Sequence, residues 1–270
     1  MNIYDELYDP NGINYGEFRS DEEYASVRER NCYADVINFL KNHGASENSK
    51  VLEIGCATGF NHNCHPNYIG IEYSRTAVEN AVKRFGADVN IKQDDATKLS
   101  FADSDIDFIL SYATLEHIPK IDRALNEIDR VLRKKGVAYL APAWNCRIWT
   151  VQKLDNFNYA DLSFKKKIAK LLIPLRGSLV YRFSVAFHLR LLDEIKYFVG
   201  IKPSLRYQEL PVDLDLIKRF GHVADDDAYI NIDAHSALMF YASKGYELIS
   251  HPTIFSRLFC RGEGIIIRKL

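Results

Sequence analysis

The chain has 270 residues, of which 47% are hydrophobic and 26% charged, and its formal net charge is −1. This composition is typical of a globular protein with a substantial core, and the balanced charge gives no case for nucleic-acid binding. The acidic N-terminus and the absence of a run of about 18 apolar residues argue against a secretory signal and a membrane span, and five scattered cysteines favour a reducing cytoplasm.

Apolar runs alternate with helical patterns along the first half of the chain. Residues 1–43 read as an irregular arm over 1–20 followed by a helix over 21–43. The alternation that follows predicts a parallel sheet covered by helices on both faces. Strands are expected at 51–54, 68–72, 89–93, 106–111 and 137–141, and helices at 75–85 and from 121 to a stop at Gly136.

The charge and the hydrophobic pattern of the chain change after Pro142. Residues 147–206 contain 12 Lys and Arg but only 4 Asp and Glu, in a strongly helical pattern. A helix over 234–244 and strands over 246–249 and 264–268 then resume the sheet. We therefore expect one α/β domain over 1–270, with a Rossmann-like, seven-stranded, mostly parallel sheet and a basic helical cap inserted after the fifth strand.

The first strand is followed by the turn EIGCATG, residues 53–59. In an open α/β sheet, ligands bind at the carboxyl ends of the strands, and the first such turn is the usual cofactor contact. Gly55 and Gly59 allow close backbone approach. A dinucleotide fingerprint would require glycine at Ala57 and a small residue at Phe60, so this pattern disfavours a pyrophosphate.

Five ordered segments resemble class I S-adenosylmethionine-dependent methyltransferases, of the type 11 or UbiE-like branch. They are VLEIGCATG, YIGIEYS, QDDATKLSF, DIDFILSYATLEHI and NEIDRVLRKKGVAYLAP, all within residues 48–144. The resemblance implies S-adenosylmethionine as cofactor, with Glu72 on the ribose diol and Asp95 on the adenine amine. It implies cofactor contacts from Glu53, Gly55, Cys56, Ala57, Gly59, Glu72, Tyr73, Asp95, Ala96, Ser111 and Tyr112. The sequence departs from the family pattern at Ala57, where glycine is usual.

The segment HNCH, residues 62–65, raises the alternative of a metal site. His62, Cys64, His65 and Cys56 are ligand types for zinc, but no CxxC pair accompanies them. The short crossover between the first two strands favours a truncated helix there instead, and we expect no metal.

Three residues are candidates for catalysis if the acceptor is a hydroxyl group. His117 follows the fourth strand, and His235 and Asp227 lie in DDDAYINIDAH, residues 225–235. We take His117 as the first candidate for a general base and His235 as the second, with Asp226 or Asp227 as orienting acids. The acidic segment also has a loose likeness to bacterial methyltransferases associated with surface glycans.

The favoured function is O-methylation of a small polar or anionic acceptor, such as a sugar, sugar nucleotide or glycan precursor. No Asn-Pro-Pro-Tyr signature follows the fourth strand, which disfavours amino methylation of a nucleobase or glutamine. Two alternatives stay open. One is a quinone or lipid methyltransferase whose basic cap makes peripheral contact with a membrane, and the other is a non-catalytic module that binds the cofactor. The cap itself is either a solvated face, a site for an anionic substrate or a membrane-surface helix.

Overall fold

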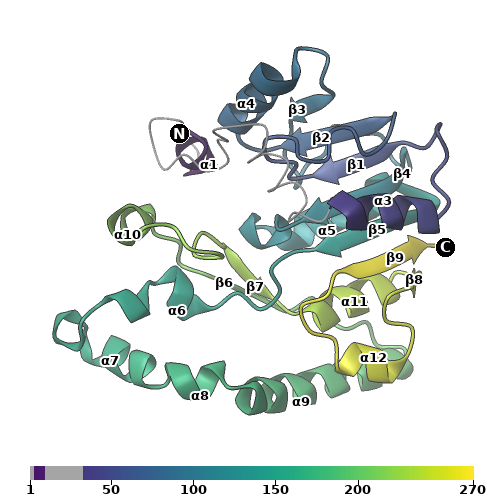
Figure 1. The fold of residues 1–270 in the computed structure, drawn as a ribbon. Helices are drawn as coiled ribbons and strands as arrows, with labels where there is room; N and C mark the ends of the chain where they lie inside the picture. The colour runs from purple at the N-terminus through teal and green to yellow at the C-terminus, as the bar shows by residue number, and fades with distance from the viewer. Residues whose placement is uncertain (1–2, 10–32) are drawn as a thin grey trace. The chain divides into compact units, whose positions relative to one another are not determined.

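A seven-stranded sheet has the order β3-β2-β1-β4-β5-β9-β8 in the computed structural model, which describes residues 3–9 and 33–270 (Figure 1). Pairing among the first five strands is parallel. The strands of this sheet are β1 (Val51–Ile54), β2 (Tyr68–Glu72), β3 (Ile91–Gln93), β4 (Ile106–Tyr112), β5 (Leu132–Ala141), β8 (Tyr246–Leu248) and β9 (Ile265–Lys269). All seven strands expected from the sequence are present, and the Rossmann-like fold is confirmed.

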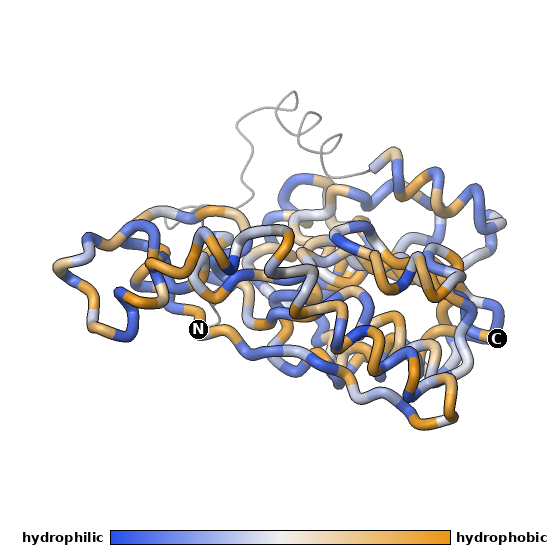
Figure 2. Tube along the Cα trace, turned by 90° about the horizontal axis from the view of Figure 1, so that it is seen from below, coloured by the Kyte–Doolittle hydropathy of each residue, from blue (hydrophilic) through white to orange (hydrophobic). Residues whose placement is uncertain are grey.

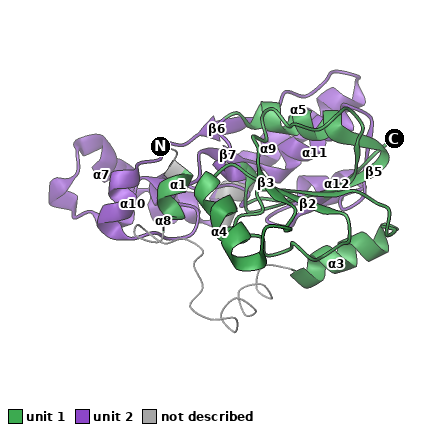
Figure 3. Ribbon diagram, turned by 90° about the horizontal axis from the view of Figure 1, so that it is seen from above, with its two compact units in different colours: residues 1–115, 120–142, 266–270 green, residues 116–119, 143–265 purple. Residues whose placement is uncertain are grey.

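The chain divides into two compact units (Figure 3). Unit 1 comprises residues 1–115, 120–142 and 266–270, and unit 2 comprises 116–119 and 143–265. The expected cap over 147–206 lies inside unit 2. The single-domain interpretation stays a prediction.

Unit 1 contains the strands that precede the cap and the helices that cover them. Its described helices are α1 (Ile3–Leu7), α3 (Tyr33–Asn42), α4 (Arg75–Phe85) and α5 (Ile121–Val131). Figure 3 shows α3 and α4 on one face of the sheet and α5 on the other. Every residue of β1 is buried, as expected of a central parallel strand covered on both faces. The side chain of Ser74 caps α4 by accepting from the Ala77 N–H, and Gly86 ends that helix at φ +94°.

Unit 2 is mostly helical. Its helices are α6 (Ile148–Val151), α7 (Phe164–Leu171), α8 (Ile173–Gly177), α9 (Leu179–Phe198), α10 (Leu214–Phe220), α11 (Ala234–Ala242) and α12 (Ile254–Leu258). Short 3-10 turns occur at Leu115–His117, Leu154–Asn156 and Tyr159–Asp161. Strands β6 (Tyr207–Glu209) and β7 (Ile230–Ile232) form a separate antiparallel pair, which the sequence patterns did not predict. No helix in the described ranges is long and apolar enough to cross a membrane.

Three local predictions were wrong. Residues 3–7 form α1 instead of irregular chain, and no helix lies between β1 and β2, where residues 59–67 form turns. The helix expected to stop at Gly136 ends at Val131, because Leu132 is already extended and pairs with Ile106 of β4. The N-terminal helix expected over 21–43 is confirmed over Tyr33–Asn42, and its first part lies outside the described residues.

Candidate functional site

The turn after β1 is closely packed around two glycines in the left-handed region. Gly55 has φ +75°, and a Cβ built there would lie 2.1–2.6 Å from atoms of the Thr114 side chain. Gly59 has φ +85°, and its added Cβ would lie 2.5 Å from the Cδ1 of Ile91. Any larger residue would therefore strain the backbone and collide with a neighbour. The two glycines are required by the shape of this turn.

Ala57 lies between these glycines with φ +49°, a conformation that costs an L-residue about 1–2 kcal/mol. Its N–H donates to Oε2 of Glu72 at 3.0 Å, and the Ser74 N–H donates to Oε1 of the same carboxylate at 3.0 Å. Glu72 ends β2 and is buried. One carboxylate thus fixes the turn after β1 to the turn after β2.

Glu53 faces into the protein. Asn61 donates to its Oε1 at 2.7 Å, and the Tyr68 hydroxyl donates to its Oε2. Burial outweighs these two hydrogen bonds and raises the pKa of Glu53 to about 7. Through these bonds Glu53 connects β1 to Asn61, which directly precedes the HNCH segment, and to Tyr68.

The HNCH side chains have partners within unit 1. Nδ1 of His62 lies 2.9 Å from the Gly59 carbonyl oxygen, and its ring stacks on Phe85 with centroids 3.9 Å apart. Nε2 of His65 lies 2.9 Å from the Ser46 carbonyl oxygen. Burial raises the pKa of Cys56 well above its usual value, which disfavours the thiolate that a metal would need.

The loop after β3 presents two aspartates with different roles. Oδ2 of Asp94 accepts from the Ser100 N–H and hydroxyl, at 3.1 and 2.8 Å, which closes the loop. Oδ1 of Asp95 accepts from the N–H and hydroxyl of Thr97, both at 2.8 Å. Both of these bonds fall on Oδ1 of Asp95. Asp95 and Ala96 are half-buried.

Buried hydroxyl groups gather at the carboxyl ends of the strands. Oγ of Ser111, beside Ile54 in the β1–β4 register, and Oγ1 of Thr58 in the turn are both buried and make no hydrogen bond within the described chain. Buried polar groups without partners are uncommon and point to an absent water or ligand. Tyr112 is half-buried, and the Tyr73 side chain is exposed. The predicted cofactor residues all lie in unit 1, and these unsatisfied hydroxyls fit a polar ligand there.

A second polar cluster lies in unit 2. Nδ1 of His117 is 3.5 Å from Oδ2 of Asp227, and its Nε2 is 3.8 Å from Oε1 of Glu116. Glu116 is fully buried and accepts from the Ala143 N–H at 2.8 Å. Burial acts to lower the pKa of His117, but the neighbouring carboxylates of Glu116 and Asp227 outweigh it and raise that pKa. The structure therefore brings two of the three predicted catalytic residues together.

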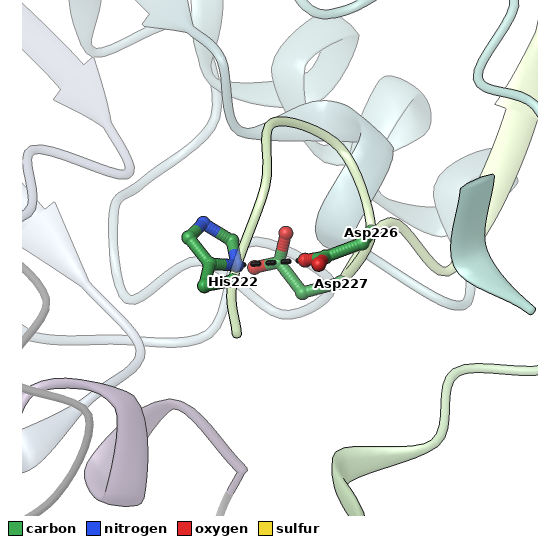
Figure 4. Close-up of side chains that lie close together, drawn as sticks. All are labelled: His222, Asp226 and Asp227. Atoms are coloured by element: carbon green, nitrogen blue, oxygen red, sulfur yellow. Dashed lines mark ion pairs between the residues drawn. The ribbon is translucent and has the colours of Figure 1, made fainter. Parts of the chain in front are cut away.

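The neighbouring Asp226 is held by two basic side chains. Nδ1 of His222 lies 2.7 Å from its Oδ1, and the buried Lys153 ammonium pairs with its Oδ2. Figure 4 shows His222 and the two aspartates pointing toward one another, and one ligand atom from each lies within 4.8 Å of the others. These donors could hold a divalent cation, although Lys153 already supplies a positive charge.

His235 occupies a different environment within unit 2. It is fully buried, with Nε2 3.2 Å from Oε1 of Glu194. Sequence reasoning missed Glu116, Lys153 and His222 as partners of the predicted residues. Glu116 adjoins His117 and could have been noticed, whereas Lys153 and His222 follow no motif.

The chain is similar to a protein-family model and to known proteins. Residues 52–140 match a family model described as a methyltransferase domain. A ubiquinone biosynthesis O-methyltransferase of Pelagibacter ubique is 27% identical over 150 residues, covering 52% of this chain and 60% of the relative. An uncharacterized Rickettsia prowazekii protein, RP789, is 32% identical over 116 residues, covering 37% of this chain and 21% of the relative. The chain thus spans less than two thirds of either curated relative.

Solved structures of methyltransferases are also similar to this chain. A SAM-dependent methyltransferase from Thermotoga maritima has 18% identity and a TM-score of 0.48, covering 98% of this chain and 97% of its own. An amino pentose methyltransferase from Micromonospora echinaspora, solved with SAM bound, has 19% identity and a TM-score of 0.39, covering 48% of this chain and 59% of its own.

Proposed function

We propose that this protein is an S-adenosylmethionine-dependent methyltransferase, because residues 52–140 match a family model described as a methyltransferase domain. The observation that carries the proposal is the cradle in unit 1, where the glycine turn, the Glu72 carboxylate and unsatisfied buried hydroxyls meet the ends of parallel strands. When bound, S-adenosylmethionine supplies a methyl group already activated on a sulfonium.

Within this cradle we assign each residue a role. Glu72 accepts from the ribose hydroxyls, and Oδ2 of Asp95 accepts from the adenine amine beside the Ala96 backbone. The turn residues Gly55, Cys56, Ala57 and Gly59 approach the methionine portion through their backbone. Ser111, Tyr112 and Tyr73 make the remaining contacts with the cofactor. Glu53 stabilises the turn through its hydrogen bonds with Asn61 and Tyr68.

We propose that the acceptor is a small polar or anionic molecule, and that a hydroxyl of a sugar, sugar nucleotide or glycan precursor is methylated in the cytoplasm. The basic composition of residues 147–206 supports an anionic acceptor. His117, oriented by Asp227, would accept the hydroxyl proton, a contribution of about 10²–10⁴-fold. His235 ranks second because it is fully buried.

Calorimetric titration with S-adenosylmethionine tests the cofactor assignment. Glu72→Ala and Asp95→Ala should each weaken binding by roughly 10- to 100-fold, since hydrogen bonds to a charged group contribute about 1.5–3 kcal/mol. Glu79→Ala is the matched control, because Glu79 is an exposed acid on α4 that pairs only locally with Arg75, at 2.7 Å. Wild-type affinity in both test variants would refute the assignment. Tight binding without turnover on any acceptor would favour the non-catalytic binding module.

A second candidate acceptor is a quinone or lipid. Two observations favour it: the sequence similarity to the ubiquinone biosynthesis enzyme and the exposed apolar side chains of α9. Turnover assays comparing hydrophobic phenols with sugar nucleotides distinguish the two acceptor classes.

A further inference from the structure

Helix α9 (Leu179–Phe198) buries three of its charged residues, namely Arg190, Asp193 and Glu194. Arg190 is buried and its guanidinium donates to both oxygens of Asp233, at 2.6 and 2.8 Å. Two further bonds from Arg190 reach the carbonyl oxygens of Leu258 and Cys260, at 2.7 and 2.9 Å. Charge-assisted hydrogen bonds therefore help to attach this side of the helix to the rest of unit 2.

The next turn of α9 repeats the arrangement. Asp193 and Glu194 are both buried. Asp193 pairs with Arg206, and Glu194 forms two bonds of 2.7 Å with Arg257. Burial acts to raise the pKa of Glu194, but the bonds from Arg257 and His235 outweigh it and lower that pKa to about 2. Glu194 is therefore ionised, and the inner face of α9 is a network of paired charges.

The opposite face of α9 exposes many apolar side chains, with the polar residues Ser184 and His188 among them. Val180 is 79% exposed, Ile195 52% and Phe198 86%. Tyr181, Val185, Leu189 and Leu192 are also exposed, and their spacing of four, four and three residues places them along one side of a helix. A helix with charges inside and aliphatic residues outside has the reverse of the pattern expected for a helix facing water.

Helices α7 and α8 extend this surface and add positive charge. Figure 1 shows α7, α8 and α9 following one another along one edge of unit 2, and Figure 2 shows hydrophobic residues interleaved with hydrophilic ones there. Phe164, Leu171 and Leu175 are 77%, 68% and 55% exposed. Lys165 and Lys166 are exposed beside them. Residues 164–192 contain Lys165, Lys166, Lys167, Lys170, Arg176, Arg182 and Arg190 but no Asp or Glu.

We propose that the outward face of α7, α8 and α9 is a docking surface for an anionic membrane, on which the helices lie at the lipid headgroups. Exposed aliphatic and aromatic side chains would enter the headgroup region while the lysines contact acidic headgroups. A second copy of this chain is a poorer occupant, because a symmetric dimer would place this positive surface against itself. None of these helices meets the criteria for crossing a membrane, so the contact is peripheral.

Vesicle co-sedimentation of the full chain, without cofactor or acceptor, tests this proposal independently of methyl transfer. The protein should bind vesicles of phosphatidylcholine containing about one third phosphatidylglycerol, and added salt should weaken binding. Replacing Lys165, Lys166 and Lys167 together by Glu should weaken it by at least about 100-fold, since each lysine near the surface contributes about fivefold. A second variant, Val180→Ser with Phe198→Ser, should abolish the binding that remains at high salt.

The matched control replaces the exposed lysines Lys41, Lys83 and Lys134 of unit 1 by Glu and should leave binding unchanged. Circular dichroism establishes that each variant is folded. Absence of binding to anionic vesicles, or equal losses in the test and control variants, would overturn the proposal. A dimer that dissociates in the Val180→Ser, Phe198→Ser variant, combined with no vesicle binding, would assign this face to a second copy instead.

Discussion

Replacing Gly55 by Ala tests how closely the cofactor turn is packed. The backbone at φ +75° costs an L-residue about 1–2 kcal/mol. The new Cβ would also lie 2.1–2.6 Å from Thr114 atoms, and overpacking of this kind costs about 1–3 kcal/mol. We therefore expect Gly55→Ala to lower the free energy of unfolding by about 2–5 kcal/mol.

Gly44→Ala separates the two contributions. Gly44 has φ +79°, close to the value at Gly55, but a Cβ there would meet no atom within 4 Å. This variant should lose only the backbone contribution of about 1–2 kcal/mol. Urea unfolding followed by circular dichroism measures both losses, and calorimetry with S-adenosylmethionine should show weaker binding only in Gly55→Ala.

Equal losses of stability in the two variants would refute this reasoning. That result would mean that the Thr114 side chain moves aside without cost and that Gly55 is needed only for its backbone angle. Unchanged cofactor affinity in a folded Gly55→Ala protein would contradict the placement of the methionine portion at this turn.

Two further predictions concern ionisable groups. Because the pKa of Glu53 is raised from 4.5 to about 7, the folded state binds this proton more tightly, so stability falls as pH rises through that window. Between about pH 5 and pH 8, the free energy of unfolding of the wild type should fall by about 3 kcal/mol relative to that of Glu53→Gln, as measured by urea unfolding. If the stabilities of the two proteins changed with pH in the same way, this prediction would be wrong. For catalysis, Asp227→Asn removes a carboxylate that raises the pKa of His117, so the acidic limb of the kcat/KM profile should shift to lower pH, whereas an unmoved limb would exclude His117 as the base.

Much of the sheet could be predicted because its strands are continuous apolar runs. Val51, Leu52 and Ile54 are each at most 1% exposed. Strands that are covered on both faces can be recognised in a sequence as continuous hydrophobic runs. The ends of elements were harder to place. Lys135 adopts φ +63° within β5, and nothing in the sequence LRKKG showed that strand pairing would replace the last turn of the helix.

The polar partners in unit 2 could not be predicted because they come from distant segments. Lys153 reaches Asp226 across 73 positions of the chain, and neither residue belongs to a local motif. The helical pattern expected within residues 147–206 is present in α9, but the orientation of this helix was not predicted. The apolar stripe of α9 would ordinarily be assigned to the core, whereas the buried ion pairs of Arg190 and Glu194 show which side faces inward.

The inverted attachment of α9 has a consequence for how this protein can change over evolution. Losing one partner of a buried ion pair costs about 3–5 kcal/mol, so Arg190 and Glu194 tolerate little variation. The outward residues contribute little to folding, so replacing them should change what this surface binds more than it changes stability. Stability and surface character are thereby encoded on opposite sides of one helix, and selection can adapt the outer side to a new environment while the scaffold beneath it is conserved.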